Sequence, residues 1–140
     1  LALVTAGPVS ADDAATHYNQ ALVLKRQGKA AEAIAECQEA IKLRPDYAAA
    51  QFTLGNLYRQ QGNLPRAASS LEQAVKLSPK DAAAHANLGA VYVRLKRVDE
   101  GIRELEAALA LKGDDFDALV SAGMAYRQKG NLPKAVELLE

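Results

Sequence analysis

The chain has 140 residues, and its 17 lysines and arginines equal its 17 aspartates and glutamates, so the net charge at pH 7 is zero. This balance gives no overall field that would favour nucleic acid or an anionic membrane as a partner. Apolar residues make up 49% of the chain and aromatic residues 5%, and an abundance of good helix formers favours an all-helical fold. The single cysteine excludes an intramolecular disulfide and leaves the redox compartment open.

Residues 1–13 differ from the rest of the chain and resemble the end of an export leader. An apolar stretch at 1–4 is followed by the helix-breaking pair at 7–8 and by small residues at 9–11, a spacing that a signal peptidase recognises. Because the chain has no initiating Met and no basic segment before the apolar stretch, we expect it to begin inside a longer leader. A disordered N-terminus is the alternative. The pattern favours an exported protein, periplasmic or secreted, over a cytoplasmic one.

From residue 14 onward the sequence repeats with a period of 34 residues. Two sets of glycines mark this period, namely Gly28, Gly62, Gly130 and Gly55, Gly89, Gly123. A period between about 20 and 50 residues is typical of a solenoid, in which each unit buries its apolar face by stacking on the next.

Each unit carries two stretches of apolar residues at helical spacing, which predicts a pair of amphipathic helices. Gly62 can end the first helix in a left-handed conformation, and Pro65 falls in the first turn of the second helix, where no amide is needed. The expected N-caps are Asp46, Asp81 and Asp115. In chain order, the predicted helices cover residues 14–27, 30–43, 48–61, 64–77, 82–95, 98–111, 116–129 and 132–140.

These motifs resemble the tetratricopeptide repeat family. The family's Leu-Gly-x-x-Tyr run appears at 54–58 and 88–92, and its closing proline appears as Pro45 and Pro79. The resemblance covers a domain at 14–140, made of three complete units (14–47, 48–81, 82–115) and part of a fourth (116–140). It implies an all-α fold, a right-handed α-solenoid of antiparallel helix pairs, which serves as a protein-interaction module and is not an enzyme.

The chain departs from the family pattern in three places. Gln20-Ala21 replaces Leu-Gly in the first unit, which suits a unit that begins the stack, and Gly113 replaces the closing proline. Gly101 replaces an alanine inside a helix, where we expect it to cost about 0.5 to 1 kcal/mol. The competing pentatricopeptide family reads single-stranded RNA. Its period is one residue longer and its surface is usually basic, and neither property fits this chain.

In this family the first helix of every unit lines a concave inner face, so the resemblance places the binding residues there. One inner position is polar in every unit and carries Asn19, Thr53, Asn87 and Ser121. These side chains could bond the backbone of an extended peptide, as a similar asparagine ladder occurs in O-linked N-acetylglucosamine transferases. Alternatively, they bond to neighbouring helices or to water.

Two adjacent inner positions near the end of the first helix supply a basic residue in every unit. They carry Lys25 with the adjacent Arg26, then Arg59, Arg94 and Arg127. This stripe favours an acidic partner. The alternative is that these cations only complement the negative ends of the helix dipoles, which gains about 0.3 to 1 kcal/mol each.

Aromatic, arginine and flexible apolar anchors concentrate binding energy in interfaces. The full set of predicted partner-binding residues is Tyr18, Asn19, Lys25, Phe52, Thr53, Asn56, Arg59, Asn87, Arg94, Ser121, Met124 and Arg127.

The family's two-carboxylate clamp, which grips the C-terminal aspartate of chaperones, is incomplete in this chain. Asn56 and Asn87 match its asparagines, but its three cations are replaced by Phe52, Asp117 and Ser121. Because Asp117 would repel a terminal carboxylate, we expect no binding of chaperone tails.

No motif in the sequence predicts catalysis, a metal or a cofactor. His17 and His85 hold equivalent positions two units apart, too far to share a metal ion, and are expected to pack between helices. Cys37 takes a core position that is leucine in other units, so we expect a buried, unreactive thiol.

The sequence therefore predicts a non-catalytic scaffold that binds a protein or extended peptide, rather than nucleic acid or membrane, in its concave groove. Two alternatives stay open. The chain stops within its eighth predicted helix, without a polar capping helix, so open ends could stack into homo-oligomers. The repeats could also recruit substrate for a larger enzyme such as a glycosyltransferase.

Overall fold

The computed structural model describes residues 11–140, and within that range the chain forms eight α-helices and no strand. In chain order they are α1 (Ala11–Arg26), α2 (Ala30–Leu43), α3 (Ala48–Gln60), α4 (Leu64–Leu77), α5 (Ala82–Arg94), α6 (Val98–Leu111), α7 (Phe116–Gln128) and α8 (Leu132–Leu139). The predicted leader lies outside the described residues except for 11–13, which belong to α1.

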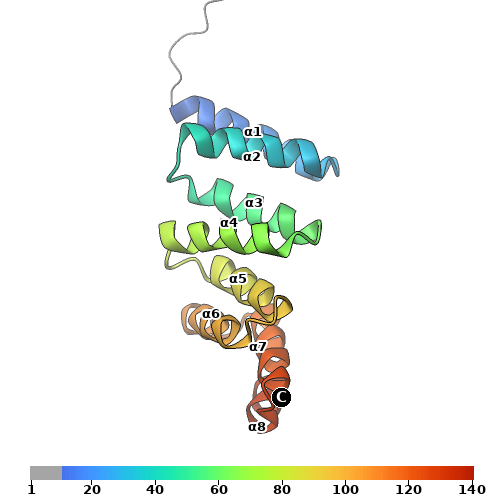
Figure 1. The fold of residues 1–140 in the computed structure, drawn as a ribbon. Helices are drawn as coiled ribbons and strands as arrows, with labels where there is room; N and C mark the ends of the chain where they lie inside the picture. The colour runs from blue at the N-terminus through green and yellow to red at the C-terminus, as the bar shows by residue number, and fades with distance from the viewer. Residues whose placement is uncertain (1–10) are drawn as a thin grey trace, which may run out of the picture.

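The helices pack as antiparallel pairs, and the pairs stack into an elongated solenoid (Figure 1). The most extensive contacts are those within the pairs: α1 with α2, α3 with α4, α5 with α6, and α7 with α8. The second helix of each pair then contacts the first helix of the next, and α5 also touches α3 and α7 directly. The first helices therefore share one face of the stack, as the family resemblance implied.

The helix boundaries differ from the predicted ones mainly at the ends of the first helices. The helices α2, α4 and α6 have the predicted bounds, whereas α1, α3, α5 and α7 each end one residue early. The next residue is the C-cap, and its N–H still bonds back to the helix, as Gln61 does to the Leu57 carbonyl at 3.1 Å. The predicted helices therefore include the C-cap residue, which keeps a helical hydrogen bond but lies outside the helix proper.

Short polar side chains begin several of the helices. Asp81 and Asp115 accept hydrogen bonds from the N–H groups three residues later, at 3.1 and 3.0 Å, as predicted. Asn63 does the same for α4. The prediction for Asp46 is wrong, because the cap residue of α3 is Tyr47, which makes no side-chain cap bond.

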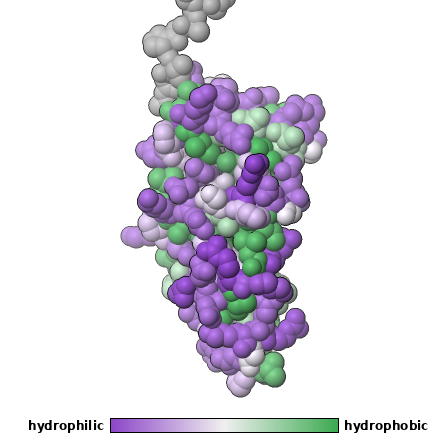
Figure 2. Space-filling model, viewed as in Figure 1, coloured by the Kyte–Doolittle hydropathy of each residue, from purple (hydrophilic) through white to green (hydrophobic). Residues whose placement is uncertain are grey.

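The core is a series of apolar layers between successive helices. Leu57, Leu71, Leu88 and Leu105 are among the largest side chains with less than 2% exposure. On the face seen in Figure 2, hydrophilic side chains dominate and hydrophobic ones surface in separate patches. This distribution is what stacked amphipathic helices produce, because each helix buries only one stripe.

Glycines let the two helices of a pair approach closely. An added Cβ on Gly55 would lie 2.6 Å from Cγ of Leu71, and one on Gly123 would lie 2.7 Å from Cγ of Leu139. Separations this short do not occur between real Cβ atoms and their neighbours. The glycine of the Leu-Gly-x-x-Tyr run is therefore a packing requirement.

Gly101 serves the same purpose, and its expected cost relative to alanine is wrong. An added Cβ on Gly101 would lie 2.6 Å from Cγ2 of Val93 and 2.9 Å from the carbonyl oxygen of Gly89. Because that oxygen belongs to the backbone, it cannot move aside without shifting α5. The close contact between α5 and α6 therefore outweighs the helix propensity of alanine.

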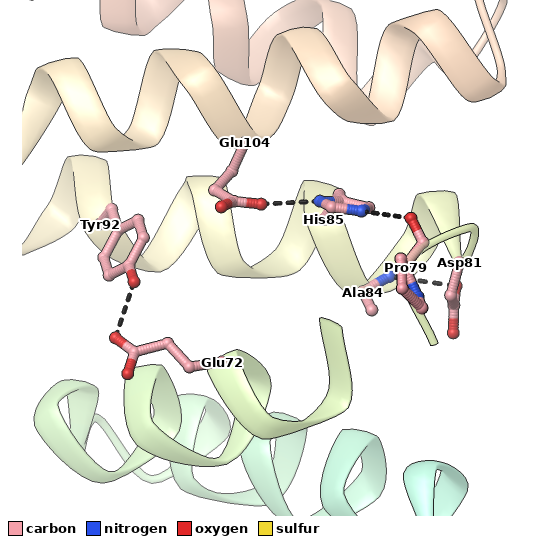
Figure 3. A network of polar contacts seen from close by, with 7 residues as sticks. All are labelled: Glu72, Pro79, Asp81, Ala84, His85, Tyr92 and Glu104. Carbon is pink, nitrogen blue, oxygen red and sulfur yellow. Dashed lines mark hydrogen bonds and ion pairs between the residues drawn. The ribbon is translucent and has the colours of Figure 1, made fainter. Parts of the chain in front are cut away.

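A tyrosine from three of the units reaches back to the second helix of the preceding unit. We call these contacts the tyrosine clasps: Tyr58 with Gln38, Tyr92 with Glu72, and Tyr126 with Glu106. The Tyr92 hydroxyl donates to Glu72 at 2.6 Å (Figure 3), and burial together with this carboxylate raises the pKa of Tyr92. The clasps tie neighbouring units together at one side of the core.

Candidate functional site

The inner face, formed by the first helices, is hollowed between α5 and α7. The cavity there measures about 390 Å³ and is lined by Arg59, Ala86, Asn87, Ala90, Phe116, Asp117, Val120 and Ser121. The hollow exists because the third unit has Ala86 and Ala90 at the inner positions where the second unit has Phe52 and Asn56. Small side chains on α5 leave room that larger ones fill elsewhere.

A second, smaller hollow continues the first along the same two helices. It measures about 140 Å³ and is lined by Ala90, Val93, Arg94, Ser121 and Met124. Because Ala90 and Ser121 line both hollows, the two form one depression. We call this depression, with its lining residues, the α5–α7 slot.

The predicted binding residues divide between the slot and the rest of the molecule. Those that line the slot are Arg59, Asn87, Arg94, Ser121 and Met124.

Outside the slot, the predicted residues differ in how far they are open to a partner. Thr53 and Asn56 are buried, with exposed fractions of 3% and 7%. Asn19, Lys25 and Arg127 are exposed.

The two predicted aromatic anchors are half-buried. Tyr18 packs its ring against that of Tyr47, with the ring centroids 5.0 Å apart. Phe52 packs against the apolar core of the first three units. Each therefore presents only part of its ring to the inner face.

Two members of the polar ladder bond across neighbouring helices. The Asn87 Nδ2 donates to Asn56 Oδ1 at 3.0 Å, which links α5 to α3. The Thr53 and Tyr18 hydroxyls lie 3.3 Å apart, which links α3 to α1. These contacts correspond to the second reading of the ladder, in which the side chains serve the packing of the helices. Ser121 remains at the wall of the slot.

The electrostatics of the slot are set by two cations and one carboxylate. Arg59 is half-buried, and its Nε is the one buried side-chain nitrogen or oxygen among the described residues that has no hydrogen-bond partner. Arg94 is exposed at the end of α5, and Asp117 is exposed at the start of α7. The ion pairs found in the described part of the chain lie elsewhere, on other side chains.

The set of predicted binding residues omitted Phe116, which lines the slot and is 74% exposed. Val120, on the same face of α7, is also absent from that set and lines the slot too. A signal for Phe116 was present in the sequence, since a large apolar residue directly after the N-cap Asp115 falls in the first turn of the helix. The alanines at 86 and 90, opposite them, are the signal for the hollow itself.

The histidines pack between the helices of a pair and each contacts a glutamate. His85 Nδ1 lies 2.7 Å from Glu104, and its Nε2 lies 2.7 Å from the Pro79 carbonyl oxygen (Figure 3). A carbonyl oxygen only accepts, so Nε2 donates in its contact with Pro79. His17 lies 2.5 Å from Glu36 in the same way.

Three other features are relevant to residues 11–140: a reactive thiol, a metal site and a membrane-spanning helix. Cys37 is fully buried, and burial raises the pKa of its thiol to about 11, which makes the thiolate scarce. Within this range no group of three His, Cys, Asp or Glu residues is placed to hold a metal ion. No helix in the same range combines the length and apolar character needed to cross a membrane.

The comparisons with known proteins agree with this architecture. The family model for the tetratricopeptide repeat matches residues 2–48, 18–82, 52–109 and 91–140. The chain belongs to the tetratricopeptide repeat family. Proteins of this family are typically interaction scaffolds, because stacked repeats build an extended binding surface.

Solved structures share the fold. A crystal structure of MamA matches with a TM-score of 0.85 and 25% identity, over 90% of this chain and 74% of that one. The Thermobaculum terrenum O-GlcNAc transferase matches with a TM-score of 0.75 and 30% identity, over 86% of this chain but 23% of that one. The first tetratricopeptide domain of Spaghetti (RPAP3), bound to the HSP90 peptide SRMEEVD, matches with a TM-score of 0.76 and 21% identity, over 94% and 96%. The comparison with curated proteins found no match.

Proposed function

We propose that this chain is a non-catalytic scaffold that binds an extended segment of a partner protein on its inner face, with the α5–α7 slot as the main point of contact. The main support for this proposal is the slot itself, because it combines apolar walls with a few polar groups, which is the usual composition of a binding site. Arg59, Asn87 and Arg94 are the polar contacts of this proposal, whereas the buried Thr53 supports the packing beneath them.

The partner is not proposed to be a chaperone tail. The RPAP3 domain is bound to such a peptide, but its likeness to this chain concerns the fold. Where the clamp needs cations, this chain has Phe52, Asp117 and Ser121. The carboxylate of Asp117 stands at the wall of the cavity, where it would repel another carboxylate.

Self-assembly and substrate recruitment for a larger enzyme stay predictions, as does export. Large apolar side chains on α8, namely Leu132, Val136 and Leu139, are more than half exposed. This surface is compatible with stacking of a further helical unit, but the slot offers the more specific chemistry.

The double variant Asn87→Ala, Arg94→Glu tests the proposed function. A displayed library of random peptides is selected on the wild-type chain, and the selected peptides are measured on both proteins. We expect the double variant to bind them at least about tenfold more weakly, since it loses an amide and reverses a charge in the slot. The matched control is Gln73→Ala, Lys80→Glu, which changes two exposed residues outside the slot and should keep full affinity.

Equal affinity of the wild type and the slot variant for the selected peptides would remove the inner-face assignment. Circular dichroism of both variants checks that the helices are retained, because Asn87→Ala also removes the bond to Asn56.

A further inference from the structure

The α5–α7 slot has a shape and a charge distribution that select among partners. We infer that it takes a polypeptide segment whose apolar side chains enter the slot and whose acidic end lies beside Arg94. This inference rests on the proposed function and names the chemical class of the partner at the same site.

The walls of the slot are apolar and favour apolar side chains on the bound segment. On α7, Phe116 and Met124 are 74% and 49% exposed, and Val120 lies between them on the same helical face. Opposite, Ala86 and Ala90 form a floor too small to cover these side chains. When a partner buries exposed apolar surface of this kind, rimmed by polar groups, the burial contributes favourably to the free energy of binding.

The length of the slot limits the number of side chains that enter it. From residue 116 to residue 124 a helix rises by about 12 Å. An extended segment, which rises by about 3.3 Å per residue, lays about four residues along this length, with alternate side chains facing the wall. The matching segment therefore carries two apolar side chains separated by one residue.

The charges give the slot a direction. The helices α5 and α7 run the same way, since each is the first helix of its unit. Asp117 therefore lies at one end of the slot and Arg94 at the other, and Arg59 enters from α3 in the same hollow that Asp117 lines. Neither arginine is among the ion pairs of the described residues. No carboxylate lines the hollow at the Arg94 end, so an acidic group is attracted there, whereas in the other hollow the carboxylate of Asp117 offsets the charge of Arg59.

Three labelled peptides of about ten residues test the inference by fluorescence anisotropy. The first carries two leucines separated by one residue and followed by two glutamates, the second has lysines for the glutamates, and the third has serines for the leucines. We expect the Leu-Glu peptide to bind at least about tenfold more tightly than either of the others. Arg94→Glu should reverse the order of the Leu-Glu and Leu-Lys peptides, and the control Lys80→Glu should not.

A second pair of variants tests the apolar part without changing any charge. Ala90→Leu fills the floor shared by the two hollows and should lower the affinity of the Leu-Glu peptide at least about tenfold. Ala35→Leu adds the same side chain at an exposed position of α2 and should leave the affinity unchanged.

The outcomes separate this inference from the proposed function. If the Leu-Lys or Ser-Glu peptide binds the wild type as tightly as the Leu-Glu peptide, the inference is wrong. If Ala90→Leu still blocks that binding, the proposed function stands. If none of the three peptides binds, the inference is wrong, and the proposed function is decided by the peptides selected from the library. If binding ignores both Ala90→Leu and Arg94→Glu, the slot is not the site and both proposals fall.

Discussion

Lys96 occupies the turn position that glycine holds in the other units. Gly28, Gly62 and Gly130 have φ values of 76°, 78° and 88°, and Lys96 has a φ of 66°. Glycine adopts this left-handed conformation at little cost, whereas an L-residue with a side chain pays about 1 to 2 kcal/mol. The turn between α5 and α6 is therefore strained, because the packing of the repeat holds Lys96 in a left-handed conformation that a residue with a side chain disfavours.

Replacing Lys96→Gly should stabilise the protein. Relief of the left-handed strain exceeds the extra chain entropy that glycine loses on folding, so we expect a net gain of about 0.5 to 1 kcal/mol in the free energy of unfolding. Urea denaturation followed by circular dichroism measures the change. Gly62→Ala is the converse control, since no atom lies within 4 Å of its added Cβ and only the backbone is affected. A lower midpoint for Lys96→Gly would contradict this account.

At the scale of elements, the α5–α6 pair is held at its spacing by glycine on both helices. A Cβ on Gly89 would lie 2.9 Å from the Gly101 carbonyl oxygen, and a Cβ on Gly101 would lie equally near the Gly89 carbonyl oxygen. Helix propensity alone ranks alanine above glycine at both places. The distance between the helices, which no local pattern encodes, reverses that ranking.

We expect Gly101→Ala to destabilise the protein by about 1 to 3 kcal/mol, the usual cost of overpacking a core. The matched control is Gly113→Ala, where the nearest atom to an added Cβ is 3.5 Å away and no strain follows. Thermal unfolding of the two variants beside the wild type makes the comparison. A Gly101→Ala midpoint at or above that of the wild type would show that the helices separate freely.

At the scale of the whole molecule, the core is a series of layers between helices and not one enclosed cluster. The cooperativity of unfolding therefore depends on contacts between neighbouring units. The tyrosine clasps are among the polar contacts between units. Tyr92 is 6% exposed and its hydroxyl joins α5 to Glu72 of α4. This clasp sits at the middle junction and couples the two halves of the solenoid.

Tyr92→Phe should weaken that junction by about 0.5 to 1.5 kcal/mol, the net worth of one hydrogen bond. Hydrogen exchange under native conditions should then be faster in α5 to α8 than in α1 and α2. The reason is that the C-terminal half of the solenoid, α5 to α8, can unfold locally once its junction with α4 is weakened. The same change in the last unit, Tyr126→Phe, is the control and should affect α7 and α8 only. Uniform acceleration along the whole chain would exclude a junction-specific role.

The sequence by itself determined the repeat, the all-α class and most of the helix bounds, because apolar spacing, left-handed glycines and N-cap aspartates act within a few residues of chain. It did not determine Gly101, the clasp of Tyr92 on Glu72, or the bond from Asn87 to Asn56. The predicted inner-face positions included Arg59 and Arg94, but the slot that they line forms because Ala86 and Ala90 on α5 lie opposite Phe116 and Met124 on α7. Such features join residues on different helices, so they depend on distances between helices that are fixed only when the units stack.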